Sequence, residues 1–248
     1  MKTAKELKYF GLTDKGMVRE KNEDAWSAHP DIGLFIVSDG MGGEFSGDIA
    51  SKIVVETLPK MIEGILGKDI NPASPEFSKR LGSEIGILSN AVRMKTRNEP
   101  GLSGMGATVA LAVIGKKHAV IAHMGDSRIY LLRKRKLIRL TKDHSIIQLL
   151  LDNNEISPEE AETHPARGQI TRFVAMEGNP LPEIKTVDVR PGDIMLLCSD
   201  GLTQMLRDSE IQEILEGKTN PEEACTELVA RANENGGKDN ITAIVIKA

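Results

Sequence analysis

The 248-residue sequence contains only two cysteines, Cys198 and Cys225. One lies in an expected strand and the other in an expected helix, so they form no disulfide framework and fit a reducing compartment. Neither belongs to a CxxC pair, and the five histidines lack the spacing typical of metal ligands. A zinc site is therefore disfavoured.

Aromatic residues, long apolar runs and excess positive charge are also scarce. Five Phe, two Tyr and one Trp imply a mainly aliphatic core. No apolar run approaches the ~20 residues that cross a bilayer, and the segment Met1–Glu6 lacks the apolar core of a signal peptide. The formal net charge of −4 gives no electrostatic footprint for nucleic acid. We expect a cytoplasmic protein with neither membrane nor nucleic-acid partners.

Helical periodicity marks two long segments early in the chain and two shorter ones near its end. The first begins after Ser46, and Pro59 inside it predicts a kink or a break. The second begins at Ser74, the expected N-cap residue. Asp143 is expected to cap a shorter helix, and Ser157 to open a capping box. The main expected helices cover 46–66, 75–92, 209–216 and 221–235.

Short apolar runs between tight turns predict the strands. Four consecutive runs are interpreted as an antiparallel meander, with the basic run Arg133–Lys136 as a solvated hairpin turn. Runs of strands joined mostly by tight turns favour antiparallel sheets with helices packed outside them, an α+β fold. No linker divides the chain, so we expect one domain spanning 1–248. The expected strands cover 8–13, 34–39, 107–114, 118–124, 128–133, 137–140, 184–189, 194–198 and 241–246.

Acidic residues recur at or just beyond the apolar segments, next to Gly or Asn. They are Asp24, Asp39, Asp126, Asp200 and Asp239. Each alone is an ordinary turn former, as Asp193 in Pro-Gly-Asp is expected to be. Together they offer the oxygen ligands that Mg²⁺ and Mn²⁺ prefer. Two of them end apolar strands in the same Ser-Asp-Gly sequence, which suggests two carboxylates delivered to one metal cluster.

Six motifs in order carry a family resemblance. They are Arg19-Glu20-Lys21-Asn22-Glu23-Asp24, Val37-Ser38-Asp39-Gly40-Met41-Gly42-Gly43, Gly104-Met105-Gly106-Ala107-Thr108, Gly125-Asp126-Ser127-Arg128, Ser199-Asp200-Gly201-Leu202-Thr203 and Gly237-Lys238-Asp239-Asn240. The chain resembles a bacterial member of the metal-dependent serine/threonine protein phosphatases (PPM, or type 2C). The resemblance implies a four-layer α-β-β-α sandwich, with a two-metal site in the cleft between two antiparallel sheets.

The resemblance also implies the metal ligands, with two Mn²⁺ or Mg²⁺ ions as cofactors. Asp39 would bridge both ions, and the Gly40 carbonyl would bind one. Asp200 and Asp239 would complete the shell of the other ion. Asp126, together with Asp200, would hold a weaker third ion. A water or hydroxide that bridges the metals would then attack phosphoserine or phosphothreonine.

Further roles follow from the same resemblance. Asp24 would hold metal-bound water, with Glu23 supporting the site. Arg19 would bind the substrate phosphate through its guanidinium fork. The segment at about 155–180 would form a flap over the cleft, with His164 as a substrate contact. The partners would be phosphorylated proteins, among them a bacterial Ser/Thr kinase and the substrates whose phosphorylation it catalyses, and the phosphatase would act as a monomer.

Three residues depart from the family pattern. Met41 stands where eukaryotic members carry a histidine proposed as general acid, so protonation of the leaving group is left to water or another group. Gln204 stands where many members have an acid, which weakens the case for a tight third metal. His123 replaces a commoner asparagine, and a structural role is favoured for it.

Three other interpretations compete. Cys225–Arg231 matches the C-x5-R signature of cysteine phosphatases, but it lies inside an expected helix whose amides cannot cradle a phosphate. An aspartyl nucleophile at Asp39 would need a second acid two residues away, where Val37 and Met41 stand instead. A catalytically dead binding module on the same fold is disfavoured because all the metal acids are present.

Overall fold

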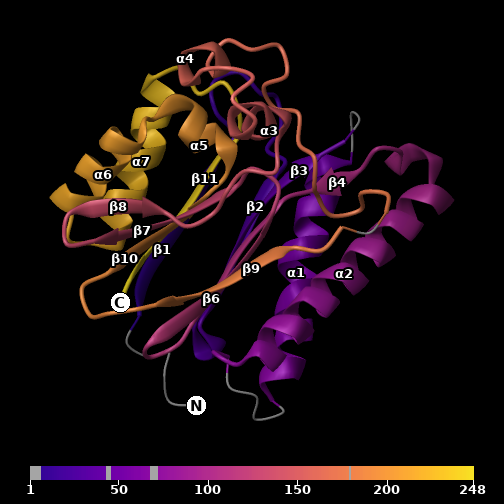
Figure 1. Ribbon diagram of the computed structural model, residues 1–248, viewed down its shortest axis with the longest axis horizontal. Coiled ribbons are helices and arrows are strands. Elements are labelled where there is room, and N and C mark those ends of the chain that lie inside the picture. Colours follow the sequence, from indigo (N-terminus) through magenta and orange to yellow (C-terminus); the bar gives the residue numbers. More distant parts are fainter. Residues whose placement is uncertain (1–6, 43–45, 68–71, 179) are drawn as a thin grey trace.

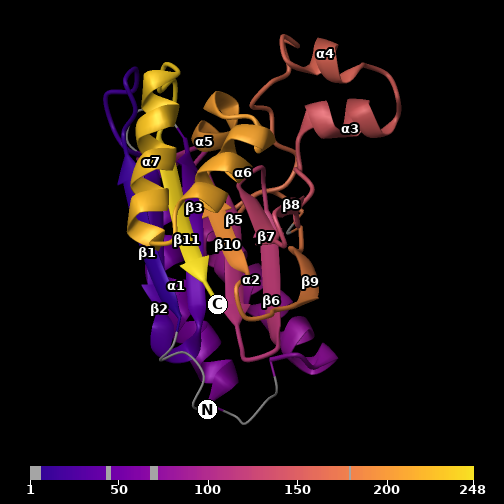
Figure 2. The same ribbon diagram turned by 90° about the vertical axis from the view of Figure 1, so that its left-hand side faces the viewer.

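The structure, a computed structural model of the chain, describes residues 7–42, 46–67, 72–178 and 180–248. The segment Met1–Glu6 and Gly43 of the glycine-rich motif lie outside the described residues. Across the described ranges, the strands form two antiparallel sheets that pack face to face, with helices on both outer faces (Figures 1 and 2). The expected four-layer α-β-β-α sandwich is confirmed.

The first sheet is formed largely by the C-terminal half of the chain. Its central strand, β10, pairs with β11 on one side and β7 on the other. In spatial order its strands are β1 (Lys8–Asp14), β11 (Ile241–Lys247), β10 (Ile194–Cys198), β7 (Arg128–Arg133) and β8 (Lys136–Arg139). The helices α5 (Asp200–Met205), α6 (Asp208–Gly217) and α7 (Pro221–Glu234) cover its outer face.

The second sheet carries most of the N-terminal half. Its strands are β2 (Asp24–His29), β3 (Leu34–Met41), β5 (Val109–Ile114), β6 (His118–Met124) and β9 (Glu183–Asp188), and the short β4 (Gly106–Ala107) pairs with β3. The helices α1 (Gly47–Leu66) and α2 (Pro75–Asn98) pack on its outer face. Short 3-10 helices lie at Pro30–Ile32 and Pro100–Leu102.

Three apolar layers hold the sandwich together. One lies between α1, α2 and the second sheet, one between the two sheets, and one between the first sheet and α5–α7. As expected, the side chains are mostly aliphatic, and Phe35, Phe77 and Tyr130 are the largest fully buried ones. Among the described residues, no helix is both long enough and apolar enough to span a bilayer.

The sequence predicted a kink or a break at Pro59, and α1 continues through this residue without a break. Ala50, Val54, Leu58 and Ile62 are all fully buried along one face of this helix. Burying each large aliphatic side chain contributes about 1.5–3 kcal/mol, so together they exceed the ~3 kcal/mol cost of an interior proline. In α2 the predicted cap is confirmed, because the Ser74 side chain accepts a hydrogen bond from the Phe77 amide.

The predicted four-strand meander is wrong. β5 and β6 pair in the second sheet, whereas β7 and β8 pair in the first. The connection Gly125–Ser127 therefore crosses from one sheet to the other instead of closing a hairpin. The Arg190–Asp193 turn likewise crosses from β9 to β10. The sheet-to-sheet crossing at 125–127 carries Asp126 to the end of the sandwich where the other acids gather.

Two short helices project from the sandwich in the region of the expected flap (Figure 2). These are α3 (Ile146–Asp152) and α4 (Pro158–Ala161), so the flap begins about ten residues earlier than the expected 155. Ser145, and not Asp143, caps α3 by accepting a hydrogen bond from the Gln148 amide. The capping box predicted at Ser157 is present in α4.

Candidate metal centre

The acids predicted as metal ligands meet at one end of the sandwich. Asp39 lies on β3, directly opposite Asp24 on β2. Asp200 is the first residue of α5, just after β10, and Asp239 lies two residues before the start of β11. Asp126 arrives on the crossing between the sheets. Both sheets therefore deliver carboxylates to the same place, as the repeated Ser-Asp-Gly sequence indicated.

A pocket of about 260 Å³ is enclosed by most of the predicted site residues. Asp24 does not line the pocket and lies beside Asp39 on the neighbouring strand. His164 does not line the pocket, and its Nδ1 accepts a hydrogen bond from the Ala166 amide at 3.1 Å. The flap reaches the pocket through Gly168 and Ile170 instead. The predicted residues that line the pocket are Arg19, Glu23, Asp39, Gly40, Asp126, Asp200 and Asp239.

Asp39 and Asp200 share a strongly negative environment. Burial raises the pKa of Asp39 well above its usual range, and the charges of Asp24, Asp200 and Asp126 raise it further. Burial also raises the pKa of Asp200, with Asp239 adding to the shift. Carboxylates crowded in this way cannot all ionise cheaply unless positive charge joins them.

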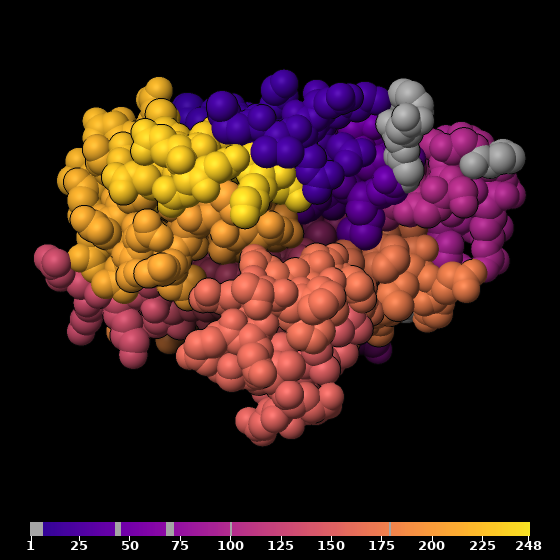
Figure 3. Space-filling model, turned by 90° about the horizontal axis from the view of Figure 1, so that it is seen from above, coloured from indigo at the N-terminus to yellow at the C-terminus, as the bar shows by residue number. Residues whose placement is uncertain are grey.

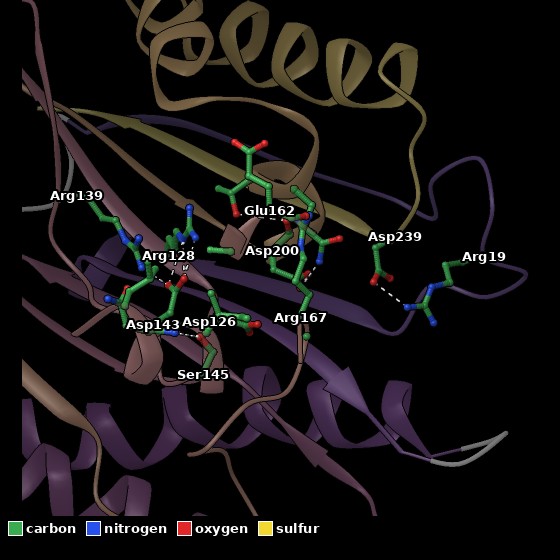
Figure 4. A pocket seen from close by; sticks show the side chains of 17 residues that line it. Arg19, Asp126, Arg128, Arg139, Asp143, Ser145, Glu162, Arg167, Asp200 and Asp239 are labelled. Carbon is green, nitrogen blue, oxygen red and sulfur yellow. Dashed lines mark hydrogen bonds and ion pairs between the residues drawn. The ribbon is translucent and has the colours of Figure 1, made fainter. Parts of the chain in front are cut away.

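The oxygen donors of the pocket fit a hard divalent cation. Oδ1 of Asp200 is buried and has no hydrogen-bond partner, while its Oδ2 accepts from the Gln204 amide nitrogen at 2.5 Å. The positive group that approaches most closely is Arg19, whose Nη2 lies 2.7 Å from Asp239 Oδ2 (Figure 4). Arg128 also acts on Asp126 and Asp200, but two arginines do not neutralise this many acids, so the residues present match an oxygen-liganded Mg²⁺ or Mn²⁺ site.

Asp24 is the most buried of the five acids. Its Oδ2 accepts hydrogen bonds from the hydroxyls of Ser199 and Thr242, both at 2.7 Å, while its buried Oδ1 has no partner. Burial raises its pKa to about 7, although the two hydroxyl contacts act in the opposite direction. The free oxygen is a ready acceptor for an ordered water.

Gly40 is required by close packing at the edge of the pocket. A Cβ there would lie 2.0 Å from the Gly47 carbonyl oxygen and 2.6 Å from that of Glu23. The Glu23 carboxylate accepts a hydrogen bond from the Gly47 amide, at the first residue of α1. Glu23 therefore ties the pocket to the N-terminus of a helix, where a negative charge is favourable.

Three residues absent from the predicted site also shape it. The Thr108 hydroxyl accepts from the Asp39 amide at 2.9 Å and lies 2.6 Å from the Ser127 hydroxyl, which links Asp39 to the loop of Asp126. Asn240 accepts from the Glu23 amide. The motifs Gly-Met-Gly-Ala-Thr and Lys-Asp-Asn contained Thr108 and Asn240, but nothing in their spacing distinguished these supports from neighbouring turn residues.

A second group of potential metal ligands, His123, His144 and Glu183, comes from β6, the segment before α3, and β9. The Gly125 amide donates to Nδ1 of His144 at 3.2 Å, so the neutral ring carries its proton on Nε2, the nitrogen that faces Glu183. His123 donates its Nε2 proton to the Lys142 carbonyl and stacks on His144, with ring centroids 4.5 Å apart. The pair is thus used structurally, as favoured for His123.

The fold and the carboxylate pocket together define a class of protein, an α-β-β-α sandwich with a cation site where its two sheets meet. Residues 17–244 match the family described as protein phosphatase 2C. The serine/threonine phosphatase stp of Listeria welshimeri is 36% identical over 241 residues, which cover 95% of this chain and 93% of that protein.

Comparison with solved structures indicates the same family. Stp1 from Staphylococcus aureus matches with a TM-score of 0.90 at 32% identity, over 100% of this chain and 97% of that one. The catalytic domain of PstP, in complex with two manganese ions, matches with a TM-score of 0.84 at 33% identity and 97% coverage of each chain. This chain belongs to the protein phosphatase 2C family and is a serine/threonine protein phosphatase.

Cys225 plays no part in this chemistry. The C-x5-R stretch Cys225–Arg231 lies wholly within α7, and the Cys225 thiol is buried with its Sγ 3.3 Å from the Ala243 carbonyl. Burial raises the pKa of this thiol to about 12. We expect Cys225→Ser to keep the kcat/KM of the phosphatase within about twofold, measured with p-nitrophenyl phosphate. A loss of turnover in a folded variant would restore the cysteine-phosphatase hypothesis.

Proposed function

We propose that the pocket binds two Mn²⁺ or Mg²⁺ ions, held by Asp39, Gly40, Asp200 and Asp239, with Asp39 between them. The observation that carries this proposal is the convergence of five carboxylates on one pocket, where Arg19 and Arg128 offset only part of the negative charge. When bound, such ions lower the pKa of a water and neutralise the charge of the phosphoryl group. No protein nucleophile is then needed.

Arg19 is the proposed anchor for the substrate phosphate. Its side chain is 52% exposed at the mouth of the pocket, and its contact with Asp239 holds the guanidinium toward the acids. A guanidinium presents a planar fork of N–H donors that matches two phosphate oxygens. Phosphoserine and phosphothreonine carry their phosphate on short side chains, and an anchor as exposed as Arg19 is within their reach.

Asp24 is proposed to position water at the centre. Its unpartnered Oδ1 is available as an acceptor, and the hydroxyls of Ser199 and Thr242 fix the carboxylate. Glu23 supports the site through its contact with the start of α1. These two acids thus orient solvent and backbone around the residues that bind the ions.

Asp126 and Asp200 are proposed to hold a third, more weakly bound ion. The Gln204 amide already occupies one lone pair of Asp200 Oδ2 and adds no negative charge. Met41 lines the pocket but has no proton to give. The leaving-group oxygen therefore takes its proton from water or from another group rather than from this position.

The biological setting forms a further part of the proposal. Residues 1–248 act as a single, monomeric phosphatase domain in the cytoplasm, on proteins phosphorylated by a Ser/Thr kinase, and so reverse the signal of that kinase. Membership of the family supports phosphorylated proteins as substrates. The direct test of the setting is phosphoproteomics of a strain that lacks the gene.

Removing metal tests the proposed chemistry. Dialysis against EDTA is expected to lower the hydrolysis of p-nitrophenyl phosphate at least about a hundredfold, because the activated water and the charge neutralisation are lost together. Added Mn²⁺ should restore the rate. Hydrolysis that persists in EDTA would contradict the metal mechanism, and no activity with Mn²⁺ present would contradict the enzyme itself.

Arg19→Ala is expected to raise KM about tenfold or more and to change kcat less, because the arginine binds phosphate in the ground state as well as in the transition state. Steady-state kinetics on a phosphothreonine peptide measure both constants. Arg19→Lys is the matched variant, since it keeps the charge but not the fork. An unchanged KM in Arg19→Ala would remove this residue as the phosphate anchor.

A further inference from the structure

The flap helix α3 is unusually apolar for a segment that lies outside the core. Five of its seven residues, in the sequence Ile-Ile-Gln-Leu-Leu-Leu-Asp, are Ile or Leu, yet none is buried. None of them belongs to the three apolar layers of the described sandwich. Figure 2 shows this helix projecting from the body of the molecule. Leu149 is exposed and the other four are only half-buried, so this helix keeps accessible apolar surface outside the core.

The inner side of α3 lines a groove that continues from the metal pocket. The groove has a volume of about 460 Å³, and Ile147, Leu151 and Ala161 form its apolar wall. Six residues line both the groove and the pocket, so the two form one continuous depression. These six are Arg19, Asp126, Gly168, Asp200, Gln204 and Asp239. Figure 3 shows the flap, in salmon, standing out beside the end of the sandwich.

The charged residues of the opposite wall are mostly satisfied among themselves. Arg128 donates to both oxygens of Asp143, which also contacts Arg139 (Figure 4). On the flap side, Arg167 donates to the Glu162 carbonyl. Away from the acids that it shares with the metal pocket, the groove is therefore lined mostly by paired charges and by the aliphatic surface of α3 and α4.

We propose that this groove binds an aliphatic side chain of the phosphoprotein substrate, within a few residues of the phosphoserine or phosphothreonine. The inference rests on the proposed function, because it requires the phosphate to sit beside Arg19 and the acids. An extended chain that leaves the pocket on the groove side must pass along Ile147 and Leu151. Covering those side chains removes apolar surface from water and so favours the matching substrate.

Paired phosphothreonine peptides test the proposal. The two peptides of each pair differ only by Leu or Ser at one flanking position, and the pairs scan both sides of the phosphothreonine. We expect kcat/KM to favour Leu about tenfold at one or more positions on one side, as a hydrophobic pocket usually discriminates. The Ile147→Ser/Leu151→Ser double variant should lose that preference.

Leu149→Ser is the matched control. Leu149 lies on the same helix and is 50% exposed, but it does not line the groove, so this variant should keep the preference. Hydrolysis of p-nitrophenyl phosphate, which has no flanking residues, reports whether each variant is folded. If the double variant does not fold, the milder Ile147→Thr should still reduce the preference.

Three outcomes would overturn the inference. One is a wild-type enzyme with no preference for Leu at any position, and another is a preference that survives in the double variant. The third is a wild-type dimer in sedimentation that the double variant abolishes with no change in peptide preference, since α3 would then cover a second copy. Failure of the proposed function would give a different result, because the wild-type enzyme would then not hydrolyse p-nitrophenyl phosphate even with Mn²⁺ present.

Discussion

Replacing Asp39 with Asn is expected to lower kcat by at least about a thousandfold. The amide keeps the size of the side chain but removes the charge that would lie between the two ions, so the electrostatic stabilisation of the transition state is lost. The measurement is steady-state hydrolysis of p-nitrophenyl phosphate at saturating Mn²⁺. Retained turnover would refute the bridging role assigned to Asp39.

The same substitution should stabilise the protein when no metal is bound. Burial and the neighbouring Asp24, Asp200 and Asp126 raise the pKa of Asp39, which means that its ionised form is held at a cost in the folded state. Asn carries no charge, so in EDTA at pH 8 the melting temperature of Asp39→Asn should exceed that of the wild type. Added Mn²⁺ should raise the wild-type melting temperature much more than that of the variant.

Asp193→Asn is the matched control, because Asp193 behaves as the ordinary turn residue that the sequence predicted. It accepts from the Arg190 amide within its turn and pairs with Arg133, and it does not line the metal pocket. This variant should keep its activity and lose some stability. An Asp39→Asn protein that is inactive and also less stable in EDTA would point to misfolding rather than to the loss of a ligand.

The positions of most helices and strands could be predicted because apolar periodicity reports the faces that are buried. The pairing of the strands could not. β6 and β7 are both almost entirely buried, and the Gly125–Ser127 turn between them looks like any tight turn. A hairpin and a crossing between sheets therefore have the same sequence pattern, and only long-range packing separates them.

The site residues could be predicted where the side-chain type alone indicates a metal ligand. They were harder to predict where the three-dimensional arrangement decides which residues line the pocket. Carboxylates at strand ends identified Asp39 and Asp200, although β3 continues through Asp39 to Met41 instead of stopping there. The projection of α3 was not predicted, because an apolar helix has the same sequence pattern whether it packs in a core or lines a groove. His164 was expected at the pocket, yet Gly168 and Ile170 are the flap residues that reach it.

His144 joins the flap to the loop that carries Asp126. Its amide donates to the Gly125 carbonyl at 2.9 Å, its Nδ1 accepts from the Gly125 amide, and its carbonyl accepts from Thr171 at 2.7 Å. An isolated antiparallel β-bridge also pairs Ser145 with Ile170. Only an unprotonated Nδ1 can accept the hydrogen bond from the Gly125 amide, so this connection depends on a neutral ring.

Protonation of His144 should therefore lower the stability of the folded protein as the pH falls. Burial, His123 and Arg172 lower the pKa of His144 from 6.5 to about 4, against the opposing effect of Glu183 and Asp143. Between these two values the unfolded chain binds a proton that the folded ring does not, so the free energy of unfolding decreases as the pH falls from 6.5 to 4. A shift of this size corresponds to about 3 kcal/mol.

His144→Asn supplies the comparison, because the Asn Oδ1 can accept the hydrogen bond from the Gly125 amide and the Asn side chain does not titrate. Urea unfolding in EDTA between pH 7 and pH 4 should show the wild type losing about 3 kcal/mol more than this variant. The carboxylates with raised pKa values act in the opposite direction, since they bind protons more readily when folded, but they are common to both proteins and largely cancel in the difference. Parallel pH profiles would mean that His144 is not held neutral, and that the link between the flap and the Asp126 loop does not depend on its protonation.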